Sequence, residues 1–163
     1  MDTVLGMSLP AFTQLHVVIS LIGIVAGLVF FGALAGGRWL RLVNTLFLVM
    51  TILTSVTGFL FPFKGVTPAV TFGIISLVLL AVACLALYGR KLSGGWRRVY
   101  LGTALIAQWL NMVVLVVQSF QKVPALHALA PTGSGPAILV GQGIMFLIVA
   151  YFAWTTVVRR PAA

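Results

Sequence analysis

Five long apolar runs, separated by short polar segments, constrain this chain more than any other feature of its sequence. A helix needs about 20 apolar residues to cross the hydrocarbon core of a bilayer. Only helices and closed barrels satisfy their backbone groups in lipid, and the alternation typical of barrel strands is absent. The predicted membrane-spanning helices are residues 12–35, 43–61, 68–88, 96–120 and 136–158.

The composition also indicates a chain that is covered by lipid. Its 163 residues are 61% hydrophobic and only 7% charged, whereas soluble domains carry about 25% charged residues. We therefore expect an all-α integral membrane protein, a single five-helix bundle with short loops. A further short helix at the membrane interface is possible over 124–130, because Pro124 suits a first helical turn and Pro131 would end it.

The first apolar run has an alternative interpretation as a cleaved signal peptide. Its end, Ala33-Leu34-Ala35, resembles a cleavage site. Signal peptides, however, begin with basic residues and have shorter apolar cores. The only charge before this run is Asp2, so we expect the run to be a retained span.

The positions of the basic residues predict the orientation of the bundle. Most of the ten Lys and Arg residues fall in segments that five spans would place on one side. These residues are Arg38, Arg41, Arg90, Lys91, Arg97, Arg98, Arg159 and Arg160; Lys64 and Lys122 fall on the other. Short basic loops stay in the cytoplasm, which predicts an outside N-terminus and a cytoplasmic C-terminus. Anionic lipids would meet the basic residues there, and nucleic acid, which needs a water-exposed basic face, is excluded.

Small and polar residues form a line along the first predicted helix. His16, Ser20, Gly23 and Gly27 are spaced by three or four residues and so share one face. A Gly-x-x-x-Gly pair lets another backbone approach closely. The line therefore predicts a packing seam, within the chain or against a second subunit. Alternatively, the seam opens outward into a polar pocket near His16.

The fourth predicted helix carries the most polar stripe. Gln108, Asn111 and Gln118 lie on one face, and unpaired carboxamides in hydrocarbon cost a few kcal/mol each. The stripe must therefore face protein or water. Two interpretations stay open at this point: hydrogen bonds between helices, or the lining of a cavity.

Neutral polar residues from several helices fall at similar depths in the outer half of the membrane. Together they predict a candidate ligand site open to the outside, made of His16, Thr54, Thr57, Asn111, Gln118 and Gln142. His127, in the segment 124–130, is either a surface histidine or a lid residue facing His16. Polar groups inside a membrane are candidates for function.

Several chemistries are excluded by the residues that are missing. Asp2 is the only acidic residue and Cys84 the only cysteine, so carboxylate proton relays, aspartate pairs and triads have no residues to form them. The two histidines do not make a metal site, and a bis-histidine haem would need His127 to fold inward. No catalytic residue, metal or required cofactor is predicted. A quinone would fit a pocket with a few polar anchors.

Two blocks of sequence resemble known proteins. They are TSVTGF at 54–59 with FPF at 61–63, and LN at 110–111, VQSF at 117–120 and KVPALHALAPT at 122–132. These blocks look like a set of small bacterial inner-membrane proteins with no known activity. The resemblance implies a bacterial source and an inner-membrane location, and it implies no activity.

The leading prediction for function is a multi-pass protein that binds or passes a small neutral or lipid-soluble molecule in a pocket open to the periplasm. An alternative is an accessory or scaffold subunit that packs in a larger complex through the Gly23 and Gly27 face. A further alternative is a subunit of a quinone- or haem-linked redox system.

Overall fold

The computed structural model describes residues 3–62, 65 and 68–159, except for the side chains of Pro68 and Ala69. Five of its helices are long and apolar enough to cross a membrane, which confirms the all-α fold class and the number of candidate spans. The elements are β1 (Thr3–Val4), β2 (Met7–Ser8), α1 (Leu9–Ala35), α2 (Arg41–Gly58), α3 (Pro68–Cys84), η1 (Leu85–Gly89), α4 (Trp96–Lys122), α5 (Pro124–His127), α6 (Pro136–Ala153) and η2 (Trp154–Val158). Four residues considered in the sequence, Asp2, Phe63, Lys64 and Arg160, lie outside the described residues.

Some helix ends differ from the prediction. Helix α2 stops at Gly58, because the amides of Phe59 and Leu60 turn back onto Val56 and Thr57 carbonyls. The short helix α5 covers only 124–127 of the predicted 124–130. In both places an apolar composition suited to a helix continues beyond the residues that form one.

A small β-hairpin precedes α1, and it was not predicted. Val4 pairs with Met7 in an antiparallel register, and Leu5 and Gly6 both have positive φ, 51° and 78°. Positive φ at both central residues is typical of a type I′ turn. Leu-Gly is not a strong signal for this turn, since asparagine or aspartate is usual at its first position.

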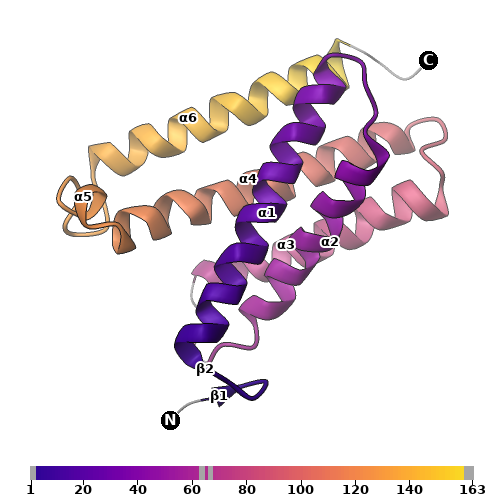
Figure 1. The fold of residues 1–163 in the computed structure, drawn as a ribbon. Helices are drawn as coiled ribbons and strands as arrows, with labels where there is room; N and C mark the ends of the chain where they lie inside the picture. Colours follow the sequence, from indigo (N-terminus) through magenta and orange to yellow (C-terminus); the bar gives the residue numbers. More distant parts are fainter. Residues whose placement is uncertain (1–2, 63–64, 66–67, 160–163) are drawn as a thin grey trace.

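Two groups of helices make up the molecule (Figure 1). The first group is the antiparallel pair of α1 and α2. The second group consists of α4 with α3 and α6, which both pack against it. We call the end with loops 36–40 and 90–95 and with Arg159 the basic end, and the end with the β-hairpin and α5 the distal end. The helices converge toward the basic end, whereas the N-terminal end of α1 and the α5 end of α4 and α6 point apart (Figure 1).

The main apolar core lies in the half of the bundle near the basic end. The rings of Phe31 and Phe47 meet edge to face at 5.7 Å, and Phe30 meets Trp39 at 5.1 Å. Tyr100 is fully buried here and its hydroxyl donates to Asn44 Oδ1. Tyr100 is therefore a core residue, although tyrosines near span ends commonly anchor at the membrane interface.

Both α3 and α6 end in a π-helical turn at the basic end. The Arg90 amide donates to the Leu85 carbonyl, and the Arg159 amide to the Trp154 carbonyl, each at 2.8 Å. In the second turn, Thr155 and Thr156 return their hydroxyls to backbone carbonyls of α6. Both threonine side chains are almost completely buried, and these bonds satisfy their hydroxyl groups.

Candidate functional site

The Gly23 and Gly27 face of α1 is covered within the chain. A Cβ added to Gly23 would lie 3.3 Å from Met50 Cβ of α2. A Cβ at Gly27 would lie 2.7 Å from Gln108 Cδ of α4 and 2.9 Å from a ring carbon of Phe47. The glycines therefore let α2 and α4 meet α1, and the expectation that a second subunit packs on this face is corrected: the face has no room for one.

Five buried polar atoms lack a hydrogen-bond partner among the described residues; two belong to Trp109 and Gln142, and the other three to Thr51, Gln108 and Asn111. Gln108 is fully buried and its Nε2 donates to the Ile24 carbonyl at 3.0 Å, but its Oε1 accepts nothing. Thr51 Oγ1 of α2 and Asn111 Nδ2, almost one turn further along α4, are also unpartnered. We call Thr51, Gln108 and Asn111 the central polar group.

The distal end of the α1–α2 pair holds His16. Its Nδ1 lies 2.7 Å from Thr57 Oγ1, and its ring meets Phe61 edge to face at 5.3 Å. Thr57 also donates to the Leu53 carbonyl at 2.7 Å. Because a hydroxyl has one proton, His16 Nδ1 then donates to Thr57, which leaves Nε2 as an acceptor.

Ser20 and Thr54 are satisfied by their own helices. The Ser20 hydroxyl donates to the His16 carbonyl at 2.7 Å, and the Thr54 hydroxyl to the Met50 carbonyl at 2.8 Å. Ser and Thr in spans commonly make such bonds to the preceding turn. Neither hydroxyl proton is therefore available to a ligand in this conformation.

The remaining predicted residues lie on α4, α5 and α6. Gln142 of α6 donates from Nε2 to the Val113 carbonyl at 3.1 Å, while its Oε1 is buried without a partner. Gln118 is half-buried on the stripe of α4. His127 is exposed, with Nδ1 3.3 Å from the Phe120 carbonyl oxygen.

The structure thus divides the predicted site into two parts. His16, Thr54 and Thr57 lie on the α1–α2 pair, and Gln142 and His127 lie where α4, α5 and α6 meet. These distal ends are separated in Figure 1, and His127 bonds to α4 rather than to His16. The stripe of α4 lies between the two parts, because Gln108 donates to the Ile24 carbonyl of α1 and the Val113 carbonyl accepts from Gln142 of α6.

The described residues contain no group of three His, Cys, Asp or Glu side chains that could hold a metal ion. No family model, curated protein or solved structure matches the chain.

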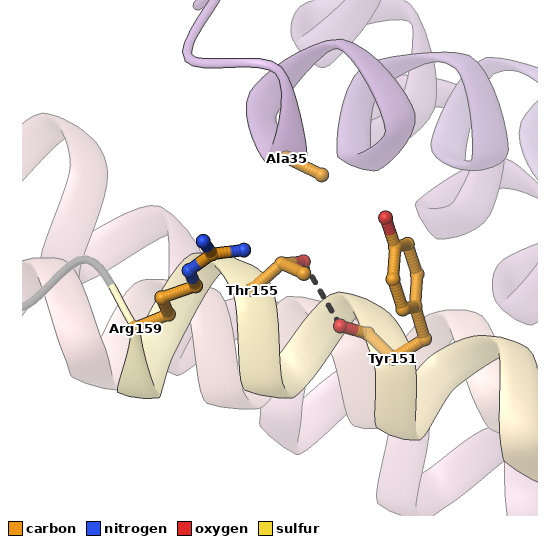
Figure 2. Close-up of a pocket in the computed structure, with 4 residues that line it drawn as sticks. All are labelled: Ala35, Tyr151, Thr155 and Arg159. Atoms are coloured by element: carbon orange, nitrogen blue, oxygen red, sulfur yellow. Dashed lines mark hydrogen bonds between the residues drawn. The ribbon is translucent and has the colours of Figure 1, made fainter.

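Two cavities lie elsewhere, away from the predicted residues. One, of about 440 Å³, is an open apolar groove along α1 and α2, lined by side chains such as Leu21 and Val25. The other, of about 360 Å³, lies at the basic end and is lined by Ala35, Tyr151, Thr155 and Arg159 (Figure 2). The sequence signal for the second was a threonine pair, 155–156, between aromatic and basic residues.

Proposed function

We propose that this protein is a multi-pass membrane protein that binds a small, neutral, lipid-soluble molecule beside the central polar group. The observation that carries the proposal is the set of three unpartnered buried atoms from two helices, Thr51 Oγ1, Gln108 Oε1 and Asn111 Nδ2. They offer a hydroxyl, an acceptor and a donor, so a ligand with both kinds of group could satisfy all three.

Two parts of the same bundle differ in how well their buried polar groups are satisfied. Asn44 and Tyr100, near the basic end, are both buried and hydrogen-bonded to each other. The central polar group lacks such partners, and leaving a buried polar group unsatisfied costs about 1–3 kcal/mol. A bound molecule would remove that cost. A quinone suits the site, because one carbonyl would accept from Asn111 Nδ2 and the Thr51 hydroxyl. Its reduced quinol form would, in addition, donate a hydroxyl proton to Gln108 Oε1.

The test is a double substitution on the stripe of α4, Asn111→Leu with Gln118→Leu. We expect the variant to remain folded and to bind a short-chain benzoquinone at least about tenfold more weakly, since Asn111, a member of the central polar group, no longer offers its donor. Native mass spectrometry of the protein, with extraction of co-purified lipid, identifies the native ligand and shows how much of it each variant retains. Titration with the benzoquinone measures the affinity.

The matched control is Thr103→Val on the same helix, because the Thr103 hydroxyl bonds only to α4 carbonyls, those of Val99 and Tyr100. This variant is expected to bind as the natural protein does. If the Asn111 and Gln118 variant is more stable and keeps all bound ligand, the stripe serves only to hold the helices together and the proposal fails.

We further propose that the basic end faces the cytoplasm of a bacterium, with the protein in its inner membrane. The chain allows a direct test, because its single cysteine, Cys84, can be replaced by alanine. Ser93→Cys in the basic loop and Ser134→Cys in the distal loop then each supply one thiol outside the spans. A membrane-impermeant maleimide should label the Ser134→Cys variant in intact cells and the Ser93→Cys variant only after permeabilisation. The reverse pattern would contradict the orientation.

A second candidate function, an accessory subunit of a larger complex, is favoured by the exposure of α6. This helix is the least buried of the candidate spans, and Leu139 and Leu147 are exposed by 70% and 67%. With the glycine face of α1 already covered, α6 is the better place for a partner helix. The mass measured in the native spectra distinguishes this function, since a strictly monomeric particle counts against it.

A further inference from the structure

The cavity at the basic end has the chemistry of a phosphate site. It lies between the last turn of α1, at Ala35, and the last turns of α6 and η2. The Tyr151 side chain extends toward Ala35, and the Arg159 guanidinium extends over Thr155 (Figure 2). One cation and one phenol therefore border the same space of about 360 Å³.

The available donors are Arg159 and Tyr151. The Thr155 hydroxyl donates to the carbonyls of Tyr151 and Phe152, at 2.9 and 3.2 Å. Thr155 therefore lines the cavity but has no proton left to donate to a ligand. The Tyr151 hydroxyl has no hydrogen bond among the described residues, and Tyr151 is 57% exposed. An arginine fork and a phenol hydroxyl are both strong donors to phosphate oxygens.

The surroundings hold the arginine in place and add positive charge. The Arg159 guanidinium carbon lies 5.6 Å from the centre of the Trp154 ring, a cation–π contact. Arg97 of α4 reaches the same turn, with Nη1 3.4 Å from the Thr156 carbonyl oxygen. No acidic side chain occurs among the described residues to neutralise Arg159.

We propose that this cavity binds the headgroup of an anionic phospholipid, with the phosphodiester held by Arg159 and Tyr151. The cavity lies at a membrane-span end, where headgroup phosphates are found. The carboxyl end of α1, at Ala35, carries the partial negative charge of its helix dipole. It disfavours a doubly charged free phosphate and favours a singly charged phosphodiester with hydroxyl donors, as in phosphatidylglycerol.

The experiment compares the retention of lipids by the purified full chain in native mass spectra. Phosphatidylglycerol is expected to remain bound where phosphatidylcholine is lost. Arg159→Gln should weaken phosphatidylglycerol retention about tenfold, because a charge-assisted bond is lost. Tyr151→Phe, which removes only the hydroxyl, should weaken it by a smaller factor.

The control is Arg98→Gln, which removes one charge at the same end but outside the cavity. Equal loss in the Arg98 and Arg159 variants would mean that only net charge matters, and the proposal would be wrong. Equal retention of phosphatidylcholine would also overturn it. A last measurement adds inorganic phosphate. If millimolar phosphate displaces phosphatidylglycerol, the cavity binds free phosphate and not a lipid.

Discussion

Replacing Gly27 by leucine is expected to lower the free energy of unfolding by about 3 kcal/mol, at the upper end for overpacked cores. The new Cβ alone would lie 2.7 Å from Gln108 Cδ and 2.9 Å from Phe47. Gln108 cannot move away easily, because it is fully buried and bonded to the Ile24 carbonyl. Unfolding of the purified protein by heat or by SDS measures the effect.

Gly32→Leu is the matched control in the same helix. A Cβ at Gly32 meets nothing within 4 Å, and the residue is exposed, so its leucine would extend into lipid. We expect a change within about 0.5 kcal/mol. If the two leucine variants are equally stable, α1 does not cross α4 at Gly27, and the arrangement in Figure 1 is wrong there.

The second large effect is expected at the buried pair of Asn44 and Tyr100. Tyr100→Phe removes the hydroxyl that donates to Asn44 Oδ1 and leaves a carboxamide that is only 2% exposed without this partner. The expected loss is about 2 kcal/mol, because the buried acceptor loses its bond and gains no water.

Adding Asn44→Leu to Tyr100→Phe should restore most of that stability. Replacing both partners of a buried hydrogen bond by apolar groups is nearly neutral, and the surrounding core is apolar. The unfolding free energies of the two single variants and the double variant form a complete cycle. A double variant as unstable as the sum of the singles would show that the two side chains do not act as a pair.

The spans were predictable from the sequence because lipid imposes a simple requirement on length and polarity. Every segment that crosses the membrane must be helical and apolar for about 20 residues. The short loops between the five apolar runs carry polar, basic or helix-breaking residues, so the limits of each run were easy to recognise. The packing role of Gly27 also followed, since glycine spacing reports where another helix can approach.

The arrangement of the polar residues was less predictable. Depth along a span can be read from position in the sequence, but depth does not say which neighbours a helix has. His16 and Gln142 were expected in one cluster, yet His16 packs on α2 and Gln142 on α4. That outcome depends on the crossing of α1 and α4, a tertiary contact with no local signal.

Two further features had weak signals or none. The β-hairpin depends on positive φ at Leu5, a residue that rarely begins such a turn. The cavity at the basic end needs Ala35 and Arg159 side by side, although Ala35 ends α1 and Arg159 follows η2. Tyr100 lies near a span end, where tyrosine is common as an interfacial anchor, and only its contact with Asn44 reveals a core residue.

The π-helical turns that end α3 and α6 have a consequence for how this chain can change in length. A π turn holds one more residue than an α turn in the same rise. Deleting one residue within 85–89 or 154–158 would therefore restore a regular α-helix and keep the flanking side chains facing as they do now. Deletion near Gly27 would instead rotate every later residue of α1 by about 100° relative to its neighbours. Single-residue deletions at the basic ends of these two spans are therefore expected to disturb the packing less than a deletion near Gly27.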